Sequence, residues 1–117
     1  MEIQVFGTHK SRDTRAALRF FSERRVKTHF VDLRERPASR GELTRFAQRF
    51  GVAALVDRCS RRYQELGLGS GLYTDEAWIQ KLADEPLLLR QPLTRSGQKL
   101  AIGTAEKEWQ SWITQRR

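Results

Sequence analysis

The first third of the chain changes its hydrophobic period twice, and this feature constrains the fold more than any other. In "EIQVF", Ile3 and Val5 alternate with polar residues, which is the two-residue period of a strand. The segment "RDTRAALRFF" after Ser11 spaces its apolar residues at helical intervals, and Ser11 suits the N-cap. The β-branched, apolar run "THFVDL" then predicts a second strand at about residues 27–33. A strand, a helix and a strand in this order predict a βαβ unit and therefore an α/β fold.

The middle of the chain predicts a run of helices. Ser39, followed by Glu42, has the spacing of a capping box and opens a helix whose apolar face is expected to include Phe50. The next stretch, "VAALVDRCSRRYQELGLG", predicts two short helical segments joined near Asp57–Ser60. Thr74 is placed to cap a further helix, "DEAWIQKLADE".

The last third predicts a β-hairpin and a final helix. The segment "LLLRQPLTRSGQKLAIG" has the pattern of two short strands, with the turn expected at Ser96–Gly97. Thr104 is placed to cap a helix that Trp109 and Trp112 dock at helical spacing. The order β-α-β, several helices, β-β-α predicts a mixed β-sheet flanked by helices, within a single domain of 117 residues.

Composition limits the classes of partner and the cellular compartment. The 22 basic residues outnumber the 14 acidic ones, which gives a net charge of +8. Such a positive field favours nucleic acid, acidic protein surfaces and phosphate-like ligands, although solvated arginine-rich helix faces give the same excess without any partner. No apolar run approaches the roughly 20 residues that span a bilayer, and the N-terminus has no apolar signal-peptide segment. We therefore expect a cytoplasmic protein without membrane association.

Cysteine and histidine are scarce. Cys59 is the only cysteine, so no internal disulfide can form, and His9 and His29 stand apart without metal-ligand spacing. We therefore expect no metal site. Arg58 and two further arginines flank Cys59 and would favour a thiolate if they point toward it. Cys59 is either a redox-active or glutathione-accepting thiol, or a half-buried residue at a helix joint.

Four segments, taken in order, resemble the arsenate reductase (ArsC) and Spx family. The first is "IQVFGTHKSRDTRAALRFF", where the family has a strand, Cys-x-x-Cys/Ser and a helix. The second is "DRCSRRYQELGL", similar to N-x-R-[GS]-x-x-aromatic-x-x-L, and the third is "LLLRQPLTRSGQKLAIG", similar to an R-P-[IL] strand followed by G-K-x-x-x-G. The fourth is the Trp-bearing final helix. The resemblance implies one thioredoxin-like domain over residues 1–117, with a helical insertion at about 38–85 after the second strand and a cis-proline at Pro92.

The resemblance places Ser11 at the nucleophile position of the family and Thr14 at its second position. A serine hydroxyl has neither the low pKa nor the redox chemistry of a thiolate, so both are degenerate catalytic positions. Ser11 would act as a nucleophile only beside a base, and His9 is the nearest candidate; the alternative is that Ser11 simply caps the helix. These departures from the family pattern favour a pseudo-enzyme over an arsenate reductase-like oxidoreductase.

Anion binding does not require a thiol, so this chain could bind an anion without the catalytic cysteine. The arsenate-reducing branch of the family has an arginine before the R-P-[IL] proline, where this chain has Gln91. Arg90 stands one place earlier, and a shift of one residue turns a strand side chain to the opposite face. The helix N-terminus after the first loop attracts anions by itself. The candidate anion-binding residues, in this loop and near the two later motifs, are His9, Lys10, Arg12, Arg58 and Arg90.

The sequence leaves three alternative functions open. The first is a non-catalytic binding or transcription-regulatory protein, whose partner, by resemblance to Spx, would be RNA polymerase or another acidic protein surface. The second is a thiol oxidoreductase or glutathione-dependent, arsenate-type reductase that uses Cys59, or Ser11 with an external thiol; glutathione or such a thiol is the only cofactor we consider. The third is direct nucleic-acid binding, which is disfavoured because the Phe and Trp residues lie on apolar helical stripes. A small oxyanion is a further candidate ligand.

Overall fold

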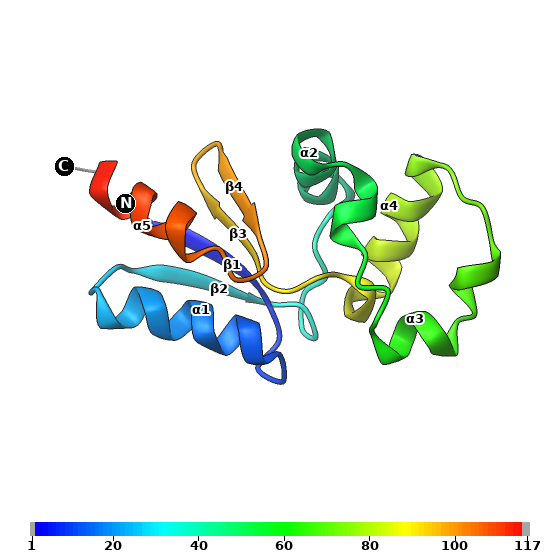
Figure 1. The fold of residues 1–117 in the computed structure, drawn as a ribbon, viewed down its shortest axis with the longest axis horizontal. Helices are drawn as coiled ribbons and strands as arrows, with labels where there is room; N and C mark the ends of the chain where they lie inside the picture. Colours follow the sequence, from blue (N-terminus) through cyan, green and yellow to red (C-terminus); the bar gives the residue numbers. More distant parts are fainter. Residues whose placement is uncertain (1, 116–117) are drawn as a thin grey trace. The chain divides into compact units, whose positions relative to one another are not determined.

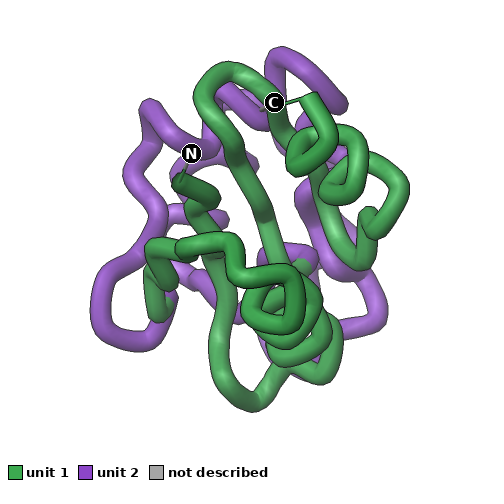
Figure 2. Tube along the Cα trace, turned by 90° about the vertical axis from the view of Figure 1, so that its left-hand side faces the viewer, with its two compact units in different colours: residues 1–32, 91–117 green, residues 33–90 purple. Residues whose placement is uncertain are grey.

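The computed structural model describes residues 2–115 and divides them into two compact units. Unit 1 contains the residues up to 32 and those from 91 onward, and unit 2 contains residues 33–90 (Figure 2). The chain therefore leaves unit 1 once, builds unit 2, and returns to complete the sheet of unit 1. None of the helices in the described part of the chain has the length and apolar character needed to cross a membrane.

Unit 1 is a four-stranded mixed sheet with two helices (Figure 1). Strand β1 (Ile3–Gly7) is central, and the order is β2-β1-β3-β4. Strand β2 (Thr28–Asp32) pairs with β1 in parallel, as the expected βαβ unit requires. The hairpin of β3 (Leu93–Ser96) and β4 (Lys99–Ile102) adds antiparallel strands on the other side of β1. Helix α1 (Arg12–Glu23) connects the parallel pair, and α5 (Glu106–Gln115) follows the hairpin.

The core of unit 1 lies where α1 and α5 pack on the sheet. Trp109 of α5 is fully buried, and its ring centroid lies 5.3 Å from that of Phe20 and 5.4 Å from that of Phe21, both on α1. The indole Nε1 donates a hydrogen bond of 2.9 Å to Oγ1 of Thr94 on β3, so the polar edge of the ring is satisfied inside the core. Remaining members of this cluster include Ile3, Val5, Ala17, Val26, Ala101 and Trp112.

Unit 2 is a set of short helices. Its longest elements are α2 (Arg40–Phe50) and α4 (Asp75–Asp84), which pack on each other. Between them stand the 3-10 turns η1 (Val52–Leu55) and η2 (Leu68–Ser70), with α3 (Arg61–Glu65) between the two, and η3 (Pro86–Leu88) follows α4. The predicted capping box of Ser39 and the predicted caps of α1 and α4 are all present. These caps form because each hydroxyl accepts from a backbone N–H only three residues further on.

Three local predictions are wrong. Phe50 is 38% exposed, because it is the last residue of α2 and the chain turns away at Gly51, whose φ is 88°. The hairpin turn lies one residue later than expected, because Ser96 still pairs with Lys99. Thr104 is not the cap of α5, since the first helical hydrogen bond runs from the Trp109 N–H to the carbonyl of Ala105.

Candidate functional site

The loop between β1 and α1 contains the position where the resemblance expects a nucleophile. Ser11 has an extended backbone (φ −76°, ψ 120°), and its Oγ accepts the Thr14 N–H at 3.1 Å. The Ser11 N–H itself donates to the carbonyl of Thr8 at 3.1 Å. Ser11 is thus the N-cap of α1, as expected, and its oxygen serves the helix end.

The second expected position, Thr14, lies in the interior. Its side chain is fully buried and packs directly over Gly7, the last residue of β1. A Cβ added at Gly7 would lie 2.3 Å from Thr14 Oγ1 and 2.7 Å from its Cγ2. Gly7 therefore permits the close approach of Thr14, and the hydroxyl of Thr14 is held in one place by the packing.

Gln91, which opens the final segment of unit 1, brings these residues together. Its Oε1 accepts the Thr8 N–H at 2.8 Å and the Thr8 hydroxyl at 3.0 Å. The Thr14 hydroxyl also donates to Oε1, at 3.4 Å. A backbone N–H can only donate, so the atom facing it is the amide oxygen, and the orientation of the Gln91 amide is fixed.

Sequence reasoning identified Gln91 only as a departure from the family arginine and did not identify Thr8. Gln91 and Thr8 are 83 residues apart, so no local pattern connects them. The nearest available signal was that Thr8 follows directly on a buried strand and a glycine. Pro92, next to Gln91, has the cis peptide bond that the resemblance implied.

The basic residues of the loop point outward. His9, Lys10 and Arg12 are all exposed. The imidazole of His9 lies against Phe30 of β2, with 4.7 Å between the ring centroids. The guanidinium of Arg15 donates to the His9 carbonyl at 2.6 Å and ties the loop to the first turns of α1.

The remaining expected site residues belong to unit 2. Arg58 donates to the hydroxyl of Tyr63 at 2.9 Å, and its guanidinium lies 5.7 Å from the Tyr63 ring and 6.0 Å from the Trp78 ring. Cys59 is exposed, not half-buried, because its N–H donates to the carboxylate of Asp57 at 3.0 Å in a tight turn at the surface. Arg90 is exposed, and its backbone N–H donates to the carbonyl of Leu55.

In one ion pair of unit 2, the pKa values of both partners are shifted. Arg62 donates two hydrogen bonds to the carboxylate of Glu85, at 2.9 and 2.8 Å. These bonds lower the pKa of Glu85 below its ordinary value and raise the pKa of Arg62. The pair connects Arg62 of α3 to Glu85, the residue that follows α4.

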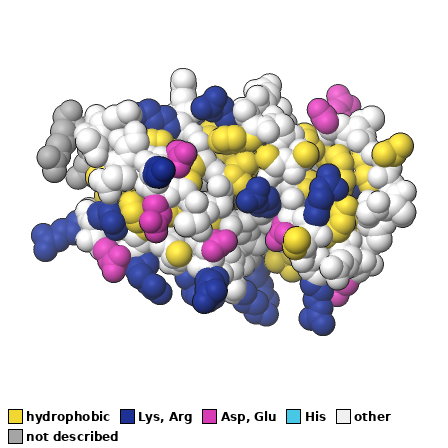
Figure 3. Space-filling view, in the orientation of Figure 1, with side chains coloured by type: hydrophobic (Ala, Val, Ile, Leu, Met, Phe, Trp, Pro, Cys, Tyr) yellow, Lys and Arg dark blue, Asp and Glu magenta, His cyan; other side chains and the backbone are white. Residues whose placement is uncertain are grey.

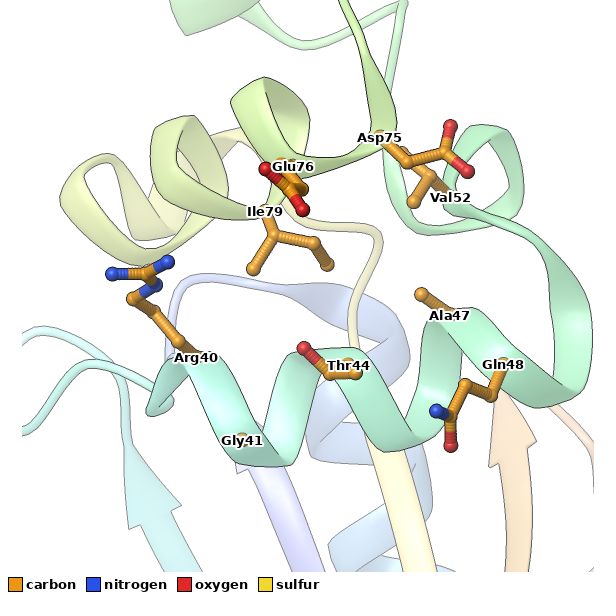
Figure 4. Close-up of a pocket in the computed structure, with 9 residues that line it drawn as sticks. All are labelled: Arg40, Gly41, Thr44, Ala47, Gln48, Val52, Asp75, Glu76 and Ile79. Carbon is orange, nitrogen blue, oxygen red and sulfur yellow. The ribbon is translucent and has the colours of Figure 1, made fainter.

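Unit 2 also has an open groove between α2 and α4, with a volume of about 750 Å³. Figure 4 shows Thr44 and Ala47 of α2 facing Ile79 of α4 across it, with Arg40 at one end and Asp75 at the other. The residues that line it include no cysteine or histidine, so it offers neither a thiol nor an imidazole for catalysis. Among the described residues, no group of three His, Cys, Asp or Glu side chains is placed to hold a metal ion.

Comparisons of sequence and of structure with known proteins point to the same family. The sequence model of one family, described as the ArsC family, matches residues 6–112. A protein named arsenate reductase from Neisseria meningitidis is 29% identical over 105 residues, which cover 87% of this chain and 90% of that protein.

Two solved structures share the fold. A putative ArsC family related protein from Bacteroides fragilis has a TM-score of 0.85 at 20% identity, with 95% of this chain and 97% of that chain covered. An arsenate reductase from Vibrio cholerae has a TM-score of 0.80 at 22% identity, with 97% of each chain covered. The expected thioredoxin-like mixed sheet flanked by helices is confirmed.

Proposed function

Because the chain belongs to the ArsC family, we propose that it is a member without thiol catalysis, and that it works in the cytoplasm as a binding or transcription-regulatory protein. The observation that carries this proposal is the role that Ser11 and Thr14 have in the structure, at the two positions where the family has its redox-active pair. Ser11 Oγ accepts the N-cap hydrogen bond of α1, and Thr14 is fully buried. A redox-active pair needs an accessible thiolate at the first position, and this loop supplies an alcohol whose oxygen is already bound.

Reductase activity tests this part of the proposal directly. We expect purified protein to reduce neither arsenate nor a small disulfide in the presence of glutathione. The matched variant is Cys59→Ala, because Cys59 is the single thiol and is exposed. Thiol-dependent turnover that Cys59→Ala abolishes would refute the proposal and establish the second candidate, a reductase that works through Cys59.

The proposed partner is an acidic protein surface, and RNA polymerase is the specific candidate that the resemblance to Spx provides. Between residues 8 and 27 there are seven Lys or Arg and two Asp or Glu, and all seven basic side chains are exposed. Arg12, Arg15 and Arg19 recur at helical spacing along α1. Figure 3 shows basic side chains along the edge of unit 1 that α1 forms. Such a row complements an acidic face and accelerates encounter with it at low salt.

Charge reversal tests this surface. Arg12→Glu combined with Arg19→Glu should weaken binding to purified bacterial RNA polymerase, measured by surface plasmon resonance at two salt concentrations. Arg45→Glu combined with Arg49→Glu is the matched control, because both are exposed on α2 and the change in net charge is the same. Equal weakening by the two pairs would show that only net charge matters. Absence of binding by the unaltered protein would refute RNA polymerase as the partner.

A further inference from the structure

The groove between α2 and α4 in unit 2 has unlike charges at its two ends (Figure 4). Arg40 lies at one end, where α2 begins, and Asp75 lies at the other, where α4 begins. Glu76, the next residue of α4, adds a second carboxylate to the α4 wall. A ligand that matches the groove therefore carries a negative group at one end and a positive group at the other.

These three charged side chains are unpaired within the part of the chain that the structure describes. No ion pair or side-chain hydrogen bond joins Arg40, Asp75 or Glu76 to another described residue. The acid of the first turn of α2, Glu42, is instead paired with Arg36 at 3.5 Å. The charges that line the groove are thus available to a ligand.

Arg40 occupies a position that does not favour the stability of its helix. It is the first residue of α2, where the positive end of the helix dipole disfavours a cation. Asp75 and Glu76 lie in the corresponding turn of α4, where the dipole favours acids, so helix stability alone accounts for them. Arg40 is therefore the part of the charge pattern that local helix energetics does not explain, and a ligand carboxylate would give it a partner.

The side chains between the charged ends are small or apolar. Ala47 is half-buried, and Val52 and Ile79 are each 8% exposed. Thr44 and Ala47 face Ile79 across the groove (Figure 4). The volume of about 750 Å³ lies within the usual range of sites for small molecules. The middle of a matching ligand is therefore aliphatic.

The length of the groove sets the length of the ligand. Arg40 and Gln48 both line it and are eight positions apart on α2. At a rise of about 1.5 Å per residue, this part of the helix is about 12 Å long. An extended peptide covers about 3.3–3.6 Å per residue, so three or four residues would bridge the two ends.

We propose that this groove binds a free apolar peptide of three or four residues. Its C-terminal carboxylate pairs with Arg40, and its N-terminal ammonium pairs with Asp75 and Glu76. Its side chains cover Ala47 and Ile79. An internal segment of a protein lacks both charged termini and does not match the groove. This inference goes beyond the proposed function, which depends on the missing thiol and on α1 in unit 1, and its failure would leave that function intact.

The tripeptide alanyl-leucyl-alanine is the probe for the first experiment, on the unaltered protein. We expect the amide resonances of Thr44, Ala47 and Ile79 to shift saturably in ¹H–¹⁵N spectra at constant pH and ionic strength. N-acetylation removes the ammonium of the peptide, and C-amidation removes its carboxylate. Each change should weaken binding by at least about tenfold, the factor that loss of one hydrogen bond to a charged group brings.

Charge reversal at Arg40 tests the carboxylate end. Arg40→Glu should weaken binding of the free tripeptide by at least about tenfold, and C-amidation should then cost no further affinity. Because an acid suits the first position of a helix, this variant is expected to fold. Arg45→Glu is the matched control, since Arg45 is exposed on the same helix and does not line the groove.

Neutralisation of the two acids tests the ammonium end. In Asp75→Asn combined with Glu76→Gln, N-acetylation of the peptide should no longer matter, whereas C-amidation still should. Glu106→Gln combined with Glu108→Gln is the control, because these residues are acids in the first turn of another helix, α5. This control should bind the peptide as the unaltered protein does.

Three results would overturn the proposal. The first is the absence of a saturable response at the groove resonances of the unaltered protein. The second is equal affinity for the free, acetylated and amidated peptides, and this comparison requires no variant to fold. The third is equal weakening of binding by Arg40→Glu and Arg45→Glu.

Discussion

The contact between Gly7 and Thr14 makes a sharp prediction about stability. In Gly7→Ala, the new Cβ would lie 2.3 Å from Thr14 Oγ1, 2.7 Å from Cγ2 and 3.0 Å from Cβ. Because even the Thr14 Cβ is too close, rotation of the side chain cannot relieve the clash, and the strand or the helix must move. Thr14 is β-branched and fully buried, so it has few alternative rotamers.

The magnitude follows from two contributions. Insertion of one methyl group into a packed interior costs about 1–3 kcal/mol. Displacement of Thr14 also weakens its hydrogen bond to Gln91, for which about 1 kcal/mol is typical. We therefore expect Gly7→Ala to lower the free energy of unfolding by about 2–4 kcal/mol, and the melting temperature by roughly 8–16 °C for a chain of this size.

The assay must report on unit 1. Urea unfolding followed by tryptophan fluorescence does so in a Trp78→Phe background, because the two other tryptophans, Trp109 and Trp112, lie in α5. Gly41→Ala on α2 of unit 2 is the control for the glycine-to-alanine exchange itself, and its unfolding is followed by far-UV circular dichroism; its added Cβ would have only Ser39 Oγ nearby, at 3.9 Å. We expect this control to be neutral or to stabilise by up to about 1 kcal/mol.

A double-mutant cycle separates the clash from other effects. Thr14→Ala removes the two atoms that come closest to the added Cβ. The combination with Gly7→Ala should therefore be less destabilised than the sum of the single changes, by about 1–2 kcal/mol. The reasoning is refuted if Gly7→Ala matches the starting protein within about 0.5 kcal/mol, or if the two changes are additive.

Three further predictions concern buried and charged groups. Thr94→Val should cost about 1–3 kcal/mol, because it leaves the buried Trp109 Nε1–H without its acceptor; urea unfolding that shows no loss would contradict this account. Glu85→Gln should destabilise slightly at neutral pH, since both side chains of the Arg62 pair are about one-third exposed. The folded-state pKa of Glu85 is lowered, so its contribution is present above the unfolded pKa and is lost as pH falls through the folded pKa. The two proteins should therefore converge in thermal melts as the pH falls below the ordinary pKa of glutamate and through the lower folded-state pKa, and a constant difference would contradict the assignment. Cys59→Ala should leave stability unchanged within about 0.5 kcal/mol, and Cys59 should react stoichiometrically with a thiol reagent in the native protein; slow reaction would show that it is covered.

The sequence alone was sufficient for features that depend on neighbours along the chain. Ser11, Ser39 and Thr74 are N-caps as predicted, because each cap is a hydrogen bond to an N–H three residues away. The strand and helix periods likewise predicted the parallel pair and the hairpin. Where the prediction depended on an element boundary, as at Thr104, packing and the first helical hydrogen bond placed the start of α5 elsewhere.

The candidate site depended on the tertiary structure. Sequence and family resemblance identified Ser11 and Thr14 as positions without a thiol and Ser11 as a helix cap, but they did not show what Thr14 does. The acceptor of Thr8 and Thr14 comes from Gln91, 83 residues beyond Thr8, and no local periodicity encodes so distant a hydrogen bond. Only the folding of β1 beside β3 brings the end of one strand to the start of the other. The sequence thus determined that this loop lacks thiol chemistry. The packing of the sheet decided that Gln91 accepts the hydrogen bonds of Thr8 and Thr14.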